Sequence, residues 1–169
     1  MIVEIVPLST LAFEKVHYYT VRLDGRPDSE FKDFITRMSQ KKNDSIELAE
    51  INRYIQKIGD EYGAHKEHFK EEDAAERLPP PYHQFIETGE PDDYGLRLYC
   101  IRLTPSVVIL LNGDRKTALK VKNCKNCYKH FDRARKISRK ITKAITDGLI
   151  EIKDDDKEII VDDDYELNI

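Results

Sequence analysis

The sequence predicts an α+β fold, with a small twisted antiparallel sheet, an N-terminal helix hairpin and a C-terminal basic helix. Three observations support this fold class. Residues 96–111 alternate in polarity and then become apolar after a short turn, which is typical of a strand hairpin. Residues 28–38 and 44–62 repeat apolar side chains every three or four positions, as amphipathic helices do. A third helical repeat begins near residue 128, and its polar positions are mostly lysine and arginine.

Length and composition indicate one globular domain, residues 1–169. Apolar residues make up 40% of the chain and fall in periodic groups, although the charged fraction of 36% is high. No apolar run approaches the roughly 20 residues that cross a bilayer, and residues 1–6 lack the basic start of a signal peptide. The three cysteines, an odd number, do not suggest a disulfide framework. We therefore expect a soluble cytoplasmic protein with no membrane partner and no cofactor.

The first half of the chain is expected to contain two strands and then two helices. Residues 2–6 are apolar, and residues 16–23 are rich in β-branched and aromatic side chains, so both favour strands. The first helix has Asp28 as its cap. The second begins at Asp44, which has the spacing of a capping box, and ends at Gly63. Two helices joined by a short polar link should pack as an antiparallel hairpin.

The second half is expected to contain a strand hairpin, a helix and a small terminal hairpin. The prolines in residues 78–82 exclude a helix and favour an extended connector. Residues 96–103 alternate, whereas residues 107–111 are apolar on both faces, as a central strand is. A helix follows from about residue 128 to Gly148. Residues 149–161 then predict two short strands around an acidic turn.

Charge is strongly segregated along the chain, although the net charge is only −4. Residues 94–146 contain 14 lysines and arginines against 2 aspartates, whereas residues 147–169 contain 10 acidic residues against 2 lysines. Such asymmetry indicates either a polyanionic partner or pairing within the molecule. We treat residues 16–146 as the core of the domain and residues 147–169 as an acidic C-terminal hairpin extension.

The order of these elements resembles the RelE/HigB-type toxins of bacterial toxin–antitoxin systems. The residues that carry the resemblance are Leu78-Pro79, the strand from Gly95 to Arg102, the strand and turn from Val107 to Gly113, and Arg115-Lys116-Thr117. It covers residues 16–146 in element order and residues 95–120 in residue detail. The resemblance implies an α+β fold and an endoribonuclease that cuts messenger RNA on the ribosome. It also implies a protein antitoxin as a partner.

Cleavage of RNA by its own 2′-hydroxyl requires a positioned phosphate and stabilisation of the charge that develops on it. Arginine suits both tasks because its planar fork pairs with phosphate in two places. Many active members of the family carry a histidine or tyrosine after the last apolar strand, where this chain has Asn112, Gly113 and Asp114. The candidate catalytic residues are therefore Arg97, Arg115 and Lys116, with Tyr128 and His130 as the nearest proton carriers.

The remaining candidates bind RNA without taking part in the reaction. Arg97 and Arg102 are five positions apart, so they face opposite sides of a regular strand, and Arg97 shares its side with Tyr99. An arginine beside an aromatic ring suits RNA. The candidate RNA-binding residues are Arg102, Lys120, Lys122, Arg133, Lys136 and Lys140.

Two further patterns have competing interpretations. Cys124 and Cys127, with His130, have the spacing of metal ligands, but a zinc site would lack its fourth ligand, so we predict no metal. The basic helix has few interleaved acids, and like charges four positions apart destabilise a helix. Its face therefore meets nucleic acid, an acidic protein segment or only solvent. The alternative function is a non-catalytic module that binds an acidic partner, and the acidic tail is a candidate for that segment within the chain itself.

Overall fold

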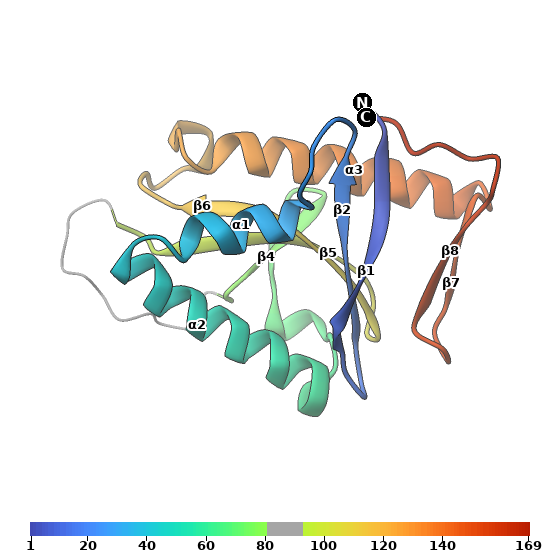
Figure 1. The fold of residues 1–169 in the computed structure, drawn as a ribbon, viewed down its shortest axis with the longest axis horizontal. Coiled ribbons are helices and arrows are strands. Elements are labelled where there is room, and N and C mark those ends of the chain that lie inside the picture. Colours follow the sequence, from blue (N-terminus) through green and yellow to red (C-terminus); the bar gives the residue numbers. More distant parts are fainter. Residues whose placement is uncertain (81–92) are drawn as a thin grey trace.

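The computed structural model describes residues 1–80 and 93–169 of the chain. The strands are β1 (Val3–Ala12), β2 (His17–Leu23), β3 (Lys70–Glu72), β4 (Ala75–Leu78), β5 (Leu96–Thr104), β6 (Val107–Arg115), β7 (Ile150–Lys153) and β8 (Glu158–Val161). The helices are α1 (Glu30–Met38), α2 (Lys42–Lys57) and α3 (Tyr128–Thr146), and three short helical turns are η1 (Ile58–Tyr62), η2 (Lys66–His68) and η3 (Val121–Asn123). Helices α1 and α2 lie on one side of the main sheet and α3 lies on the other (Figure 1).

The predicted small antiparallel sheet is wrong, because the main sheet is mixed and contains six of the described strands. Their order is β1-β2-β6-β5-β4-β3. Strand β2 runs parallel to β6, with His17 opposite Val107 and Tyr19 opposite Ile109, and all other neighbours are antiparallel. The apolar β6 is buried on both faces, and its backbone pairs with β5 along its length and with β2 over Val107–Ile109.

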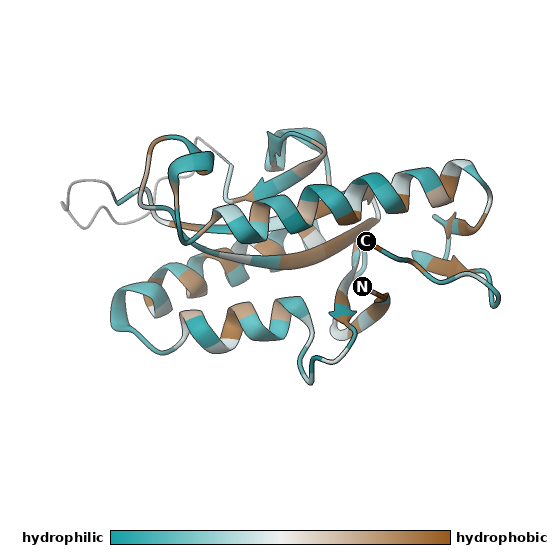
Figure 2. Cartoon of the chain, turned by 90° about the horizontal axis from the view of Figure 1, so that it is seen from above, coloured by the Kyte–Doolittle hydropathy of each residue, from teal (hydrophilic) through white to brown (hydrophobic). Residues whose placement is uncertain are grey.

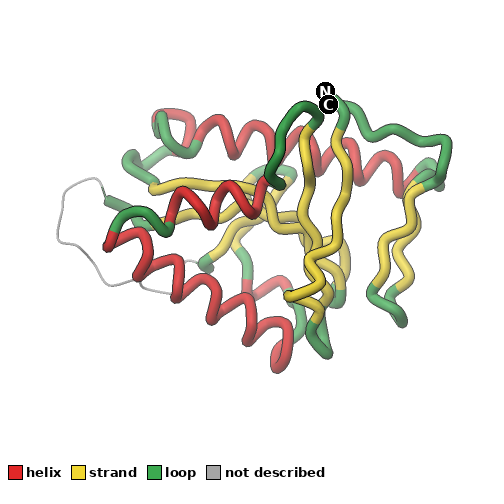
Figure 3. Tube along the Cα trace, viewed as in Figure 1, coloured by secondary structure: helices red, strands yellow, loops and turns green. Residues whose placement is uncertain are grey.

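The predicted N-terminal helix hairpin and C-terminal basic helix are wrong as well. Helices α1 and α2 follow two strands, and α1 buries Phe31 and Phe34 against the sheet. Helix α3 is followed by β7 and β8, which stand at one end of it in Figure 3. The chain then returns to β1, where Val3 N–H donates to the carbonyl of Leu167 at 2.8 Å. The tail comes back because Leu167 completes the apolar core beneath α3.

The strand hairpin predicted for residues 96–111 is confirmed as β5 and β6, and these strands pair from Leu96 to Thr104. Gly113 is required where the two strands approach most closely. A Cβ atom at this position would lie 1.7 Å from the carbonyl oxygen of Arg97, so no larger residue fits. Of the predicted extended connector, Leu78 ends β4, whereas Pro81 and Tyr82 lie outside the described residues.

The sheet separates two apolar cores, and the alternation of β5 supplies both. Leu96, Leu98 and Cys100 pack toward α1 and α2, whereas Tyr99 and Ile101 pack toward α3. Helix α3 closes the second core with its apolar side and leaves its hydrophilic side outward (Figure 2). None of the helices in the described parts of the chain is long and apolar enough to cross a membrane.

Candidate anion-binding site

Arg115 lies among three carboxylates, which hold its guanidinium in the fold. Its Nε donates to Asp44 at 2.8 Å, one Nη donates to Asp93 at 2.6 Å, and the other contacts Glu47. Burial alone would lower the pKa of Arg115, but these three hydrogen bonds raise it. Arg115 therefore joins the end of β6 to the first turns of α2, and its donors are engaged before any ligand arrives.

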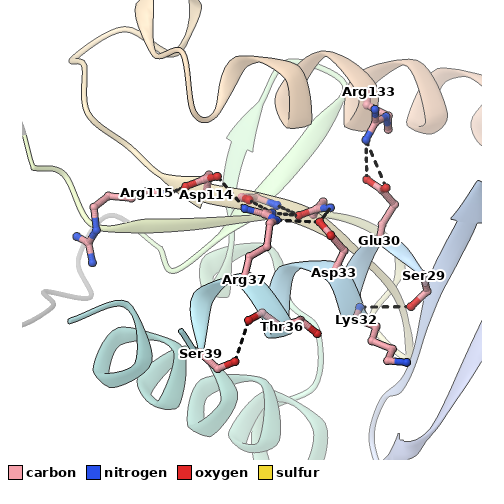
Figure 4. A network of polar contacts seen from close by, with 12 residues as sticks. Ser29, Glu30, Lys32, Asp33, Thr36, Arg37, Ser39, Asp114, Arg115 and Arg133 are labelled. Atoms are coloured by element: carbon pink, nitrogen blue, oxygen red, sulfur yellow. Dashed lines mark hydrogen bonds and ion pairs between the residues drawn. The ribbon is translucent and has the colours of Figure 1, made fainter. Parts of the chain in front are cut away.

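Arg37 forms a second neutralised site on the same side of the sheet, shown in Figure 4. Its Nε donates to Asp33 at 2.8 Å, and one Nη donates to Asp114 at 2.8 Å. The other Nη contacts the side-chain oxygen of Asn112 and donates to the carbonyl of Gly113 at 2.7 Å. Burial opposes ionisation of Asp33, but hydrogen bonds from Asn112 and Arg37 lower its pKa. This network fastens α1 to β6.

The residues predicted to bind RNA are divided between paired and exposed positions. Three of them contact carboxylates: Arg102 with Glu76, Arg133 with Glu30, and Lys136 with Asp132. The other three are exposed or on the loop before α3, and make no ion pair within the described residues: Lys120, Lys122 and Lys140. The paired arginines have roles within the fold, so the exposed lysines are the members of this set that are open to a ligand.

The two candidate proton carriers on α3 do not lie together. His130 is only 5% exposed, and neither ring nitrogen has a hydrogen-bond partner in the described structure. Burial, and secondly the charge of Arg37, lower the pKa of His130 to about 3. Tyr128 is 41% exposed, at the start of the helix. His130 is thus a neutral, buried residue of α3 on which the charge of Arg37 acts, whereas Tyr128 faces solvent.

Arg97 has a different environment from the arginines above. It lies on the α3 face of β5, and Arg77 of β4 shares that face because it pairs directly with Tyr99. One Nη of Arg97 donates to the carbonyl of Leu96 at 3.0 Å, but its buried Nε has no partner in the described parts of the chain. Burial, followed by the charge of Arg77, lowers the pKa of Arg97 to about 10.

Lys116 joins Arg97 through an extension of the β5–β6 ladder. Its N–H donates to the carbonyl of Gly95, and its carbonyl accepts from Tyr94 N–H, both at 2.9 Å. The ammonium lies 5.8 Å from the centre of the Tyr94 ring. Burial lowers the pKa of Lys116, and the neighbouring charge of Arg97 adds to that effect. The two cations therefore destabilise each other's charge.

Arg77, Arg97 and Lys116 form what we call the basic cluster. Glu72 is the carboxylate that acts on all three: it accepts from Arg77 at 2.8 Å, and its charge opposes the pKa lowering of the other two. Arg77 also donates to the carbonyl of Pro79 at 2.7 Å. Among the residues that the structure describes, these three cations share one carboxylate, which leaves an excess of positive charge at a half-buried position. An anion would neutralise that excess.

Aromatic rings connect the basic cluster with the surface of α3. The ring of Tyr99 lies 5.9 Å from that of Phe131, and Phe131 lies 6.4 Å from the exposed Tyr128. The guanidinium of Arg135 stands over Phe131 at 5.6 Å. The cluster and these rings lie near the N-terminal end of α3, where backbone N–H groups favour anions. The arrangement can hold a phosphate, and Tyr128 is the exposed ring among these three.

The sequence analysis identified Arg97 and Lys116 but missed Arg77. Arg77 stands next to the Leu78-Pro79 pair, yet a single arginine in a short strand carries no periodic signal, and only the β4–β5 register places it beside Tyr99. Within residues 1–80 and 93–169, no group of three or more histidine, cysteine or acidic side chains could hold a metal ion. No family model, curated protein or solved structure matches the chain.

Proposed function

We propose that the chain is an RNA-binding protein of the RelE/HigB toxin type, in which the basic cluster binds a phosphate of the RNA backbone. The supporting observation is the buried guanidinium of Arg97, whose Nε has no partner within the described residues. A buried polar group without a partner destabilises the fold, and a buried charge does so more strongly. Such a group is expected where a ligand supplies the missing partner.

RNA is favoured over a small anion by the surroundings of the cluster. Single-stranded RNA exposes bases that stack on aromatic side chains while its phosphates contact cations. Tyr128, 41% exposed, offers such a ring at the surface, and the half-buried Phe131 and the buried Tyr99 connect it with the cluster. The exposed Lys120 and Lys122 precede the helix and add positive charge. The cytoplasm, the ribosome and a protein antitoxin belong to this proposal, as expected from the resemblance.

We further propose that the cluster cleaves messenger RNA by a metal-independent route. Burial and the charge of Arg97 lower the pKa of Lys116, so its amine is neutral more often than that of a free lysine and can accept the 2′-hydroxyl proton. Arg97 and Arg77 then stabilise the charge that develops on the phosphate. Tyr128, one ring further out, is the candidate to return a proton to the leaving oxygen.

The binding step is tested with a fluorescent single-stranded RNA, whose polarisation is measured over a range of salt concentrations. Arg97→Gln should weaken binding about tenfold or more, because it removes a charge-assisted contact. It should also lower the slope of log affinity against log salt by about 0.7, the loss of one single-strand phosphate contact. The matched control is Arg102→Gln, which changes the same residue type on the other face of β5. Equal affinities for wild type and Arg97→Gln would refute the proposed site.

The cleavage step is tested by inducing the chain in a bacterial host while following growth and messenger RNA integrity. The wild type should stop growth and cut transcripts, and Arg97→Gln should do neither. Lys116→Ala should keep part of the RNA affinity but lose cleavage, because it removes the proton acceptor and leaves both arginines. Normal growth with intact transcripts in the wild type would refute the proposed nuclease activity and leave RNA binding as the proposed function.

A second function, binding of an acidic protein segment, is favoured by a groove on the outer side of α3. The groove has a volume of about 290 Å³ and is lined by Lys136, Arg139, Lys140, Lys143 and Ile169. An apolar floor with cations around it suits an acidic segment that carries one apolar residue. In the described residues, the acidic tail reaches this helix with one ion pair, between Lys143 and Asp147. If Lys140→Glu loses binding of a fluorescent acidic peptide and Arg97→Gln binds the peptide like the wild type, the helix face is the site of this second function.

A further inference from the structure

Two of the three cysteines lie together where the chain enters α3. Cys124 lies one turn before Cys127, the N-cap of α3: its carbonyl accepts from Tyr128 N–H at 2.9 Å, and its sulfur accepts from Cys127 N–H at 3.4 Å. This is the side-chain contact that a capping serine or threonine makes with the third residue beyond it. It brings the two side chains of the Cys-Lys-Asn-Cys sequence to the same side of the turn.

The sulfur of Cys124 accepts further hydrogen bonds. Thr117 N–H donates to it at 3.4 Å, and the Thr117 hydroxyl lies 3.7 Å away. Burial alone would raise the pKa of Cys124, but the N–H groups of Thr117 and Cys127 outweigh it and lower the pKa. N–H donors and a helix N-terminus are the environment that activates cysteine in redox proteins.

Cys127 has the opposite environment. It is fully buried, its S–H donates to the carbonyl of Asp114 at 3.4 Å, and burial together with the neighbouring sulfur of Cys124 raises its pKa. One thiol of the pair is therefore prepared to lose its proton and the other to keep it. This asymmetry separates an attacking cysteine from a resolving cysteine.

We propose that Cys124 and Cys127 are a dithiol site that oxidises reversibly to a disulfide, with Cys124 as the attacking sulfur. A disulfide between these two cysteines would close only a very short loop. It would stabilise the fold little, because the entropy that a crosslink removes from the unfolded chain grows with loop length. A disulfide between residues three apart is instead typical of redox-active pairs. Such sites also occur in compartments where structural disulfides are rare.

The reaction balances with a low-molecular-weight disulfide, such as oxidised glutathione, as the oxidant. The Cys124 thiolate attacks one sulfur of glutathione disulfide, forms a mixed disulfide and releases one glutathione thiolate. Cys127 gives its proton to the released thiolate and then attacks the Cys124 sulfur, which releases the second glutathione. The protein loses two protons and two electrons, and the oxidant takes up both and becomes two molecules of reduced glutathione.

Access to Cys124 depends on the loop above it. Cys124 is 1% exposed, and residues 116–123 cover it through Thr117. In that loop, Ala118 and Val121 pack against the core, whereas Leu119 is 71% accessible, so only part of the loop is held by apolar contacts. We therefore expect oxidation of the folded protein to be slower than that of a free cysteine and to require the loop to lift.

Cys100 is the natural control. It is also fully buried, but it lies on the other face of β5, in the core under α1 and α2, and burial raises its pKa. No partner cysteine is on that side of the sheet. Cys100→Ser removes one thiol without touching the proposed pair.

The folded chain is incubated in glutathione buffers of increasing oxidised fraction, and the reaction is quenched with acid. Free thiols are then counted, and the mass of the protein is measured. The wild type and Cys100→Ser should each lose two thiols and two hydrogens, and reduced glutathione should reverse the change. Cys127→Ser should stop at one bound glutathione, and Cys124→Ser should react with none. Circular dichroism of each variant shows whether it is folded.

The proposal fails if the folded wild type keeps all three thiols in a buffer that oxidises the unfolded chain. It also fails if peptide mapping finds Cys100 in the disulfide. One consequence rests on the proposed function: Cys127 donates to the carbonyl of Asp114, the register partner of Arg97, so loss of this hydrogen bond on oxidation should change the affinity for the fluorescent RNA. Thiol counting does not depend on RNA, so failure of RNA binding and failure of disulfide formation are separate results.

Discussion

The arginines on the two sides of the sheet show how differently one residue type can be used. On the side of α1 and α2, Arg37 and Arg115 have every nitrogen directed at a carboxylate, amide or carbonyl oxygen. On the α3 side, Arg97 has a buried Nε with no partner among the described residues. The first pair joins helices to the sheet, whereas Arg97 carries charge that the fold leaves unbalanced.

The position of Asp114 explains much of this contrast. Asp114 is the register partner of Arg97 in the β5–β6 ladder, so the two would be expected to pair. Its carboxylate instead accepts from Arg37 of α1, at 2.8 Å. The helix thereby engages the carboxylate opposite Arg97 in the ladder, which leaves that arginine available for an external anion.

The largest expected effect comes from the neutralised side. Arg115→Met should lower the free energy of unfolding by about 3–5 kcal/mol, because Asp44, Glu47 and Asp93 would be left buried without their cation. Urea unfolding followed by circular dichroism measures the change. Arg115→Lys should give an intermediate loss, since a point charge cannot reach all three carboxylates. An Arg115→Met protein as stable as the wild type would show that this network contributes nothing to the fold.

Acidification should have the next largest effect, through the buried His130 of α3. His130 has a folded pKa of about 3 against 6.5 in the unfolded chain, so between these values only the unfolded state takes up the proton. The folded state therefore has its full stability with respect to His130 above pH 6.5, and it loses stability as the pH falls below that value. The loss between pH 7.5 and pH 5 should be about 2 kcal/mol. His130→Leu should be correspondingly less sensitive in urea unfolding at the two pH values; an unchanged sensitivity contradicts this assignment.

The smallest expected effect has the opposite sign. Arg97→Met should raise the free energy of unfolding by about 1 kcal/mol, because it removes a buried donor that has no partner. The same substitution should abolish RNA binding if the proposed function is correct. Arg115→Met is the matched comparison, since it makes the same chemical change on the other side. Strong destabilisation by Arg97→Met would mean that the fold itself uses this charge.

Tests of the acidic tail should use charge changes and not truncation. The tail returns to β1, where Ile169 N–H donates to the carbonyl of Met1 at 3.0 Å and Ile2 bridges to Asn168. Leu167 and Ile150 are also buried in the core below α3. Removal of residues 149–169 would therefore expose apolar surface and confuse a change in binding with a loss of folding.

Several strands and helices could be predicted from the sequence, because the spacing of apolar residues within each segment determines its secondary structure. The alternation of residues 96–103 and the apolar run 107–111 indicate paired strands, which β5 and β6 confirm. Opposite faces for Arg97 and Arg102 follow from the two-residue repeat of a strand. The parallel pairing of β2 with β6 could not be predicted in this way, because it joins residues 90 positions apart that carry no mutual signal.

The sequence by itself determined the periodicity of the strands and helices, the concentration of basic residues in 94–146, and the Cys-Lys-Asn-Cys spacing before α3. Only the tertiary structure decided which of those charges are neutralised. Asp44, Asp93 and Glu47 reach Arg115 from distant positions in the chain, whereas no carboxylate does the same for Arg97 within the described residues. The physical reason is that electrostatic pairing depends on distance and burial in space, and neither quantity is contained in the order of residues.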